Sequence, residues 1–175
     1  LRAAAALARA VGYDGEANRW SDSAHRLAGV VAQTFGAHGY PRTVPNGGAD
    51  AAVTFLAPPF TPPSAQLSRA VSDTASLLAL PNGGVRPGTA WRDDRSAWTP
   101  EVSLFALAAA GVGDRRAAEA RLDWLGRHRT AAGTIAEKVG PHGEPLSVAP
   151  LAWTDALVVL TVAKLATGVD LAPPA

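Results

Sequence analysis

The stretch TPEVSLFALAAAGVGDRRAAEARLDWL, residues 99–125, has the pattern of two helices joined by a tight turn. Thr99 is a candidate N-cap, Pro100 suits the first helical position, and Glu101 complements the positive end of the helix dipole. Asp114 is positioned to cap the second helix. The inward face of that second helix is expected to carry Ala118, Leu122 and Leu125. The stretch therefore predicts a pair of packed helices with a short connection.

Helical periodicity recurs along the rest of the chain, with apolar residues spaced by three and four positions. The further predicted helices cover residues 1–11, about 20–34, a short segment from Asp50 to Pro58-Pro59, a segment from Ser64 through Leu78, and about 150–167, ending at Gly168. The last of these is apolar nearly all round, which is typical of a buried helix. Almost no segment alternates with period two. We therefore predict an all-α fold, with residues 1–175 in one domain.

The connections between the predicted helices differ greatly in length. Only a tight turn separates Gly111 from Asp114, whereas residues 35–48, 81–98 and 130–149 form long loops rich in glycine, proline, tryptophan and charge. Long loops in a compact domain tend to carry function. Alternating short and long connections predict that the functional loops gather at one end of the helix pairs, as in an α/α barrel. A solenoid would share this arrangement, but no repeated consensus is present.

Composition excludes several classes of function. The net charge of the chain is +1 and its arginines are scattered, which argues against a nucleic-acid-binding protein. The chain has no cysteine and its four histidines are isolated, so we predict no disulfide, no metal site and no cofactor. The longest apolar stretch, residues 151–166, is too short and too polar to span a membrane. Because the chain begins at Leu1, we expect further sequence upstream and assign no compartment.

The stretch GTIAEKVGPHGEPLSVAPLAWTDALVVL, residues 133–160, has the composition of a functional loop. It places a carboxylate in a glycine-flanked loop, continues through a second Gly/Pro turn, and then enters an apolar helix. This order should lift Glu137 to the rim of a helical core. Ser147 and Trp153 should return close to Glu137 as the chain enters the helix.

This stretch resembles the last conserved block of family 15 glycoside hydrolases, the glucoamylase family. The likeness rests on Glu137-Lys138, Gly143, Leu146-Ser147 and Leu151-Ala152-Trp153-Thr154. It implies that Glu137 is the general base, that Ser147 hydrogen-bonds this base, and that Trp153 lines the sugar pocket. Asp155 departs from the histidine or tyrosine common at its position, so the likeness assigns it no role.

A second block, residues 83–111, is similar to the family's arginine-containing loop and the helix that follows it. The likeness implies that Arg86 binds sugar hydroxyls in the glucosyl subsite and that Trp98 is the subsite aromatic. Trp91 lies near a further family aromatic, in a looser alignment. Pro87 replaces the usual tyrosine, which puts the fine shape of the pocket in doubt. Arginine supplies several fixed donors, and a tryptophan face suits the C–H face of a pyranose.

The resemblance implies both a fold and an activity. The fold is a partial (α/α)6 barrel, the six-hairpin glycosidase toroid, of which this chain would form roughly the second half. The activity is that of an inverting, exo-acting α-glucoside hydrolase that releases glucose from oligo- or polysaccharides. Such enzymes need an acid and a base about 6.5–9.5 Å apart. The family's acid lies in a Trp-Glu motif, which we expect upstream of this chain, because Glu16 and Glu101 are poor substitutes. The expected partners are an α-glucan or oligosaccharide substrate and the upstream half of the barrel.

Each candidate residue also has a plain structural interpretation. Glu137 could be a solvated loop carboxylate, Arg86 could pair with Asp93 or Asp94, Trp98 could staple the following helix, and Trp153 could belong to the core. Two other functions compete with hydrolysis. One is a non-catalytic helical-barrel protein that binds sugar or acts as a scaffold. The other is a terpene- or prenyl-processing α/α toroid, for which Asp93-Asp94 would be the diphosphate site.

Overall fold

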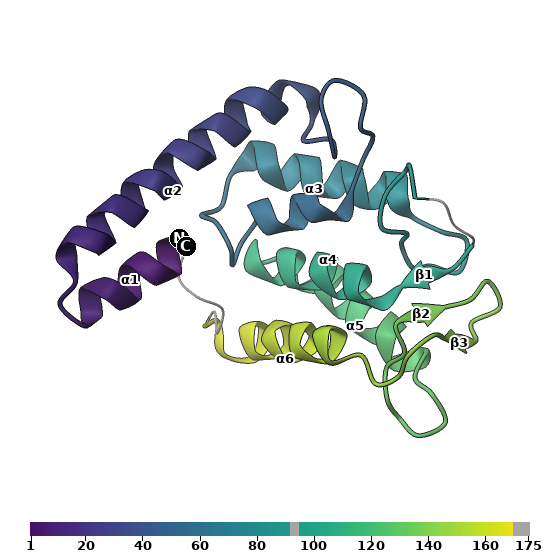
Figure 1. Cartoon of the computed structure of the whole chain (residues 1–175). Coiled ribbons are helices and arrows are strands. Elements are labelled where there is room, and N and C mark those ends of the chain that lie inside the picture. Colours follow the sequence, from purple (N-terminus) through teal and green to yellow (C-terminus); the bar gives the residue numbers. More distant parts are fainter. Residues whose placement is uncertain (92–94, 170–175) are drawn as a thin grey trace.

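A computed structural model describes residues 1–91 and 95–169 of the chain, and its described part is mainly helical (Figure 1). The α-helices are α1 (Arg2–Ala10), α2 (Asp14–Phe35), α3 (Ala65–Leu78), α4 (Thr99–Gly111), α5 (Arg115–Arg127) and α6 (Ala152–Thr167). Two short 3-10 helices, η1 (Gly36–His38) and η2 (Ala51–Leu56), precede α3. The predicted helical class is thus confirmed.

A small antiparallel sheet was not predicted. Its strands are β1 (Ala97–Trp98), β2 (Lys138–Val139) and β3 (Pro145–Leu146), in the order β1-β2-β3. Each strand has two residues, which is too short for an alternating pattern to be read in the sequence. In Figure 1 the sheet lies beside the beginning of α4, at one end of the helices. It ties two of the long loops together at that end.

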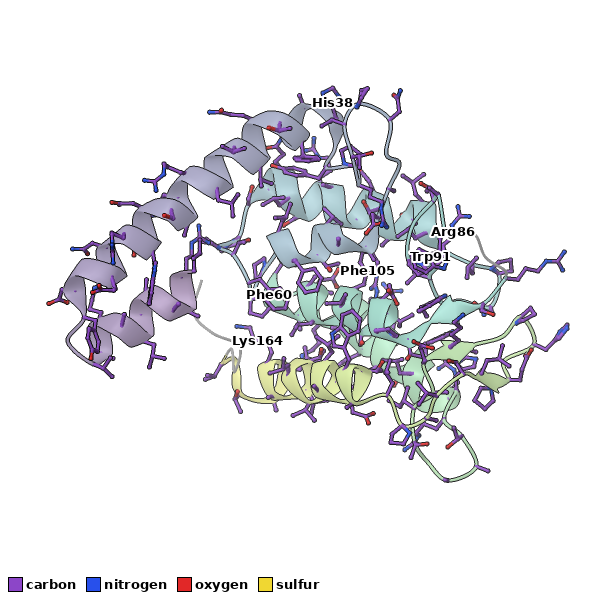
Figure 2. The ribbon with its side chains drawn as sticks, in the orientation of Figure 1. His38, Phe60, Arg86, Trp91, Phe105 and Lys164 are labelled. Atoms are coloured by element: carbon purple, nitrogen blue, oxygen red, sulfur yellow. The ribbon has the colours of Figure 1, made fainter. Side chains whose placement is uncertain are left out.

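Helix α4 forms the centre of the structure, and α5 and α6 both pack on it. Almost every residue of α4 is buried, because the helix is apolar on all sides. Phe105 of α4, labelled in Figure 2, packs in the main core cluster. Its partners there include Leu78, Val85, Trp124, Leu125 and Val139. Trp124 also donates from Nε1 to the carbonyl of Asn82 at 2.8 Å, as a buried indole N–H usually requires.

Three of the predicted helix starts are capped by a side chain. The side chain of Asp50 accepts a bond from the Ala52 N–H at 2.9 Å and begins η2. Ser64 caps α3, and Asp114 caps α5 by accepting from the Ala117 N–H at 3.0 Å. Each cap satisfies a backbone donor that the helix itself leaves unpaired.

The start of α4 differs from the prediction. Its N-cap residue is Trp98, which makes no side-chain capping bond. The hydroxyl of Thr99 instead donates to the carbonyl of Ala136 at 2.7 Å, in a loop distant in sequence. Thr99 therefore links two elements instead of capping one. Pro100 does lie in the first turn, as predicted.

Helix α2 begins six residues earlier than the predicted start at residue 20. Asp14 and Glu16 lie in its first turn, where negative charge is favoured by the helix dipole. Glu16 also pairs with Arg19 at 3.0 Å, one turn further along. The Tyr-Asp-Gly sequence that resembles a surface turn is thus the beginning of the helix.

Helix α6 is less buried than its composition predicts. Thr154, Leu157 and Thr161 are buried on one side. On the other side the apolar residues Val159 and Val162 are 62% and 50% exposed. An apolar helix with one bare face leaves a surface of the kind that marks an interaction site. No helix in the described ranges is long and apolar enough to cross a membrane.

Candidate active site

The long loops meet at one end of the helices, as the sequence predicts. The loop before η2 joins the loop after α3 through two backbone bonds, from Thr89 N to Ala49 O at 2.9 Å and from Ala51 N to Pro87 O at 2.8 Å. The loop after α3 then joins the loop after α5 through the pairing of β1 with β2. Segments that are remote in sequence are therefore held side by side around the beginning of α4.

Glu137 is fixed in this cluster by its main chain. Its N–H donates to the Val148 carbonyl at 2.8 Å, and its own carbonyl accepts from the Thr99 N–H at 2.9 Å. The Leu151 N–H also donates to the Ile135 carbonyl at 3.0 Å, which draws the start of α6 towards the same loop. The half-buried Glu137 side chain thus stands where α4 and α6 both begin.

The side chain of Ser147 donates a hydrogen bond from its hydroxyl to Oε2 of Glu137. This is the contact that the sequence predicts across ten residues. Ser147 adopts a φ of 67°, in the left-handed region that non-glycine residues rarely occupy. Such conformations cluster at functional sites, where the surrounding structure maintains them. The bond orients one of the two carboxylate oxygens of Glu137.

Two of the predicted aromatic residues pack together. The rings of Trp91 and Trp98 are 5.4 Å apart between centroids, in an edge-to-face arrangement. Nζ of Lys138 lies 4.2 Å from the centroid of the Trp98 ring, within cation–π range. The Trp98 ring is therefore held between a neighbouring indole and a strand residue next to Glu137. Figure 2 shows Trp91 and Arg86 on the loop between α3 and β1.

Among the residues that the structure describes, three buried side-chain polar atoms have no hydrogen-bond partner. They are Nε of Arg86, Nε1 of Trp98 and Oε2 of Glu101. Trp98 donates its backbone N–H to Val85 at 2.9 Å, which places Trp98 next to Arg86. Unpartnered buried groups are rare in native structures, so such a group often awaits a ligand or water. Arg86, Trp98 and Glu101 belong to the loop before α4 and to its first turn, the segments that meet the Glu137 loop.

Burial raises the pKa of Glu101 to about 7. Its own backbone N–H opposes this shift, while the negative charges of Asp50 and Glu137 add to it. Sequence reasoning identified the helix-start position of Glu101 but missed its burial and its place in the carboxylate cluster. The available signal was its position between the core-type residues Pro100 and Val102 at the start of a helix that is apolar all round.

Trp153 lies in the first turn of α6 and is 48% exposed, so the described residues do not enclose its ring. Asp93 and Asp94, the candidate diphosphate site and the alternative partners of Arg86, lie outside the described residues. A cavity of about 350 Å³ opens beside Trp91 and Asp50. Its wall includes Arg42, whose Nη1 contacts Oδ2 of Asp50 at 2.8 Å, but it does not include Glu137. The described part of the chain holds no cluster of histidine, aspartate and glutamate residues suited to a metal ion.

Comparison with known proteins finds similarity in structure but not in sequence families. No family model matches the sequence, and no curated protein matches it. Two solved structures of glycosidases are similar to it. A wild-type glycosidase superposes with a TM-score of 0.73 at 19% identity, over 90% of this chain and 46% of that chain. A tyrosine-to-phenylalanine glycosidase variant superposes with a TM-score of 0.74 at 18% identity, over 92% of this chain and 47% of that chain. The chain therefore has a glycosidase fold, and it spans less than half the length of the glycosidases that it matches.

Proposed function

We propose that this chain carries the general base and part of the sugar pocket of an inverting, exo-acting α-glucoside hydrolase of the glucoamylase or glucodextranase type. Such an enzyme would release glucose from oligo- or polysaccharides. The observation that carries the proposal is the hydrogen bond from Ser147 to Glu137, made from a loop whose backbone is fixed at the start of α4 and α6. The glycosidase fold supports the same class of reaction.

The proposed reaction follows from the placement of Glu137. Its carboxylate takes a proton from a water molecule, and the water oxygen attacks the anomeric carbon opposite the bond that breaks. The leaving oxygen receives its proton from a general acid on the other face of the sugar. The hydrogen bond from Ser147 holds one oxygen of Glu137, so the second oxygen is free to accept the proton from water.

In this proposal the substrate is held by residues of the same loops. Arg86 and Trp98 are proposed to donate to sugar hydroxyls, because their buried Nε and Nε1 atoms have no hydrogen-bond partner among the described residues. Trp91 packs edge-on against Trp98 and lines the cavity next to it. Trp153 presents an exposed indole at the start of α6, where a second wall of the pocket would cover it.

The general acid is proposed to come from the upstream half of the same (α/α)6 barrel. The chain matches less than half of the two glycosidases, so a full barrel needs further helices. The bare apolar side of α6, with Val159 and Val162, is a suitable surface for those helices. On this proposal the residues 1–175 alone hold a base and half a pocket, and hydrolysis requires the complete protein.

The test is the replacement Glu137→Gln in the complete protein, assayed on maltose and isomaltose. Loss of a general base typically lowers the rate by about 10²–10⁴-fold. Glu144→Gln is the matched control, since Glu144 lies in the same loop and its side chain accepts a bond from the His142 N–H at 2.9 Å. Near-normal hydrolysis by the Glu137 variant would rule out the proposed role. Glucose binding without hydrolysis in the unmodified protein would instead identify a sugar-binding protein.

A further inference from the structure

The proposed function leaves Glu101 without a role, although this carboxyl group lies near Glu137 and has a raised pKa. It lies in the first turn of α4, three residues after Trp98. Its Oε2 atom is buried and has no hydrogen-bond partner in the described structure. Helix starts commonly hold glutamate at the surface, where it complements the dipole. A buried, unpartnered oxygen is not explained by that function.

The surroundings of Glu101 place it in the same wall as Glu137. Thr99 lies two residues before Glu101 in the first turn of α4. Its backbone N–H donates to the Glu137 carbonyl at 2.9 Å. Asp50 and Glu137 are close enough for their negative charges to act on the Glu101 carboxyl. Three carboxyl groups, from the loop before η2, from α4 and from the loop before β2, therefore surround one end of α4.

Resting on the proposed function, we propose that Glu101 is a further substrate-contacting residue, whose carboxyl bonds a hydroxyl of the glucosyl unit beside Arg86 and Trp98. The three unpartnered atoms include both hydrogen-bond donors and an acceptor, as the hydroxyls of a sugar require. Arg86 and Trp98 supply N–H donors, and Glu101 supplies an acceptor. A pair of vicinal hydroxyls both donates and accepts, so it satisfies such a mixed set, whereas an anion would be repelled by the carboxyl groups.

The charges around Glu101 favour a neutral carboxyl over a second anion. Asp50 and Glu137 both face it with negative charge. Two cations of the same loops are engaged elsewhere, since Arg42 pairs with Asp50 and Lys138 lies over the Trp98 ring. Burial then holds the pKa of Glu101 at about 7. A protonated carboxyl can donate one hydrogen bond and accept another, which suits a sugar hydroxyl.

The same geometry distinguishes Glu101 from a general acid. In an inverting enzyme the acid and the base act on opposite faces of the sugar. Glu101 and Glu137 approach from one wall, because the first turn of α4 is bonded directly to the backbone of Glu137. Glu101 can therefore hold the sugar against the base, while protonation of the leaving group is assigned to a residue on the far side.

The experiment compares Glu101→Gln and Glu101→Ala in the complete protein. Glucose binding is measured by calorimetry in a Glu137→Gln background, and hydrolysis is measured on maltose and on α-glucosyl fluoride, whose leaving group needs no acid. We expect Glu101→Ala to weaken glucose binding about 10-fold or more, and to lower kcat/KM on both substrates by a similar factor. Glu101→Gln should retain more of the binding, because an amide also donates and accepts.

Two results would overturn the inference. Unchanged glucose affinity in Glu101→Ala, with native-like thermal unfolding, would show that the carboxyl does not touch the sugar. A loss confined to maltose, with α-glucosyl fluoride hydrolysed normally, would make Glu101 the acid instead. If instead the proposed function itself is wrong, the Glu137→Gln variant will hydrolyse maltose normally. If the unmodified protein binds no glucose, the inference about Glu101 fails as well.

Discussion

The hydroxyl oxygens of Thr99 and Thr154 lie 2.9 Å apart, and both side chains are fully buried. Thr99 also donates to the carbonyl of Ala136 at 2.7 Å, so Thr154 supplies the proton that joins the two threonines. This small network links the first turn of α4 to the first turn of α6, directly beside the residue that precedes Glu137. It connects the helix core to the proposed base through side chains that never reach solvent.

The two threonines should differ in their effect on stability. Thr154→Val removes one hydrogen bond and leaves no buried donor unpaired, so we expect a loss of about 1 kcal/mol. Thr99→Val leaves both the carbonyl of Ala136 and the buried hydroxyl of Thr154 without their partner, and we expect a loss of about 2–3 kcal/mol. Denaturant unfolding of the two near-isosteric variants measures the difference. Equal losses would show that leaving these two groups unpaired costs little.

Two replacements of Ser147 distinguish the effect of its hydrogen bond to Glu137 from the effect of its left-handed backbone conformation. Ser147→Ala removes the donor to Glu137 and keeps a side chain at a φ of 67°. Ser147→Gly removes the same donor but relieves a cost of about 1 kcal/mol for the left-handed conformation. We expect both variants to lose a similar share of kcat, while thermal unfolding finds the glycine variant more stable. Higher kcat in the alanine variant than in the glycine variant would show that the backbone conformation matters beyond the bond.

The raised pKa of Glu101 predicts a pH dependence of stability. Its folded-state pKa is about 7, above the ordinary value of 4.5, so the native state binds more protons than the unfolded state between these values. The contribution of Glu101 to the free energy of unfolding should therefore be largest below about pH 4.5. It should decrease by up to about 3 kcal/mol as the pH rises to about 7. Other carboxyl groups also titrate in this range, so the difference from Glu101→Gln isolates the contribution.

In Glu101→Gln the group no longer ionises, so its share of the decline should disappear. Denaturant unfolding at pH 5, 6, 7 and 8 should give the variant a growing relative advantage as pH increases. A constant difference between the two proteins across this range would mean that Glu101 has an ordinary pKa.

Gly84 should tolerate no side chain. A Cβ atom there would lie 2.4 Å from the Cβ of Ala97 and 2.7 Å from Cζ2 of Trp124, both of them core atoms. Overpacking of this kind costs about 1–3 kcal/mol or more, and we expect Gly84→Ala to reach the upper end. Gly29→Ala is the matched control, because it lies within α2 with open space around it and should gain about 0.5–1 kcal/mol. Thermal unfolding of the pair tests the packing.

If the exposed apolar side of α6 is covered in the complete protein, a charge placed there should destabilise it. If the upstream half of the barrel covers Val159, then Val159→Lys in the complete protein buries a charge and should cost about 2 kcal/mol or more. Val112→Lys, at a 43% exposed site in the turn between α4 and α5, should cost less than about 0.5 kcal/mol. Equal and small effects in unfolding measurements would place the covering helices elsewhere.

The sequence predicted those features that depend on neighbouring residues. Asp114 and Ser64 cap helices by local geometry, and the short connection after Gly111 follows from the same pattern. The contact between Ser147 and Glu137 was also predictable, because only ten residues and one turn separate them. In each of these cases the partner lies close in the chain.

Features that join remote segments were missed. Thr99 looks like a cap, but its bonds go to Ala136 and to Thr154, and no local signal specifies those partners. The burial of Glu101 depends on loops that return from elsewhere in the chain, so its sequence context suggested only a dipole effect. The exposure of α6 has a different origin, since its composition suits a helix covered on both sides while the described residues cover one.

The position of Glu137 rests on its own main-chain N–H and carbonyl. Those two bonds are independent of the side chains that surround it, because every residue except proline offers the same backbone groups. The neighbouring loop residues are consequently free to vary, in natural divergence or in the laboratory, while the backbone of Glu137 keeps its place. If the proposed hydrolase function holds, an engineer seeking a different sugar or linkage should therefore randomise the side chains around Glu137 and leave the backbone pairing of residues 135–151 intact.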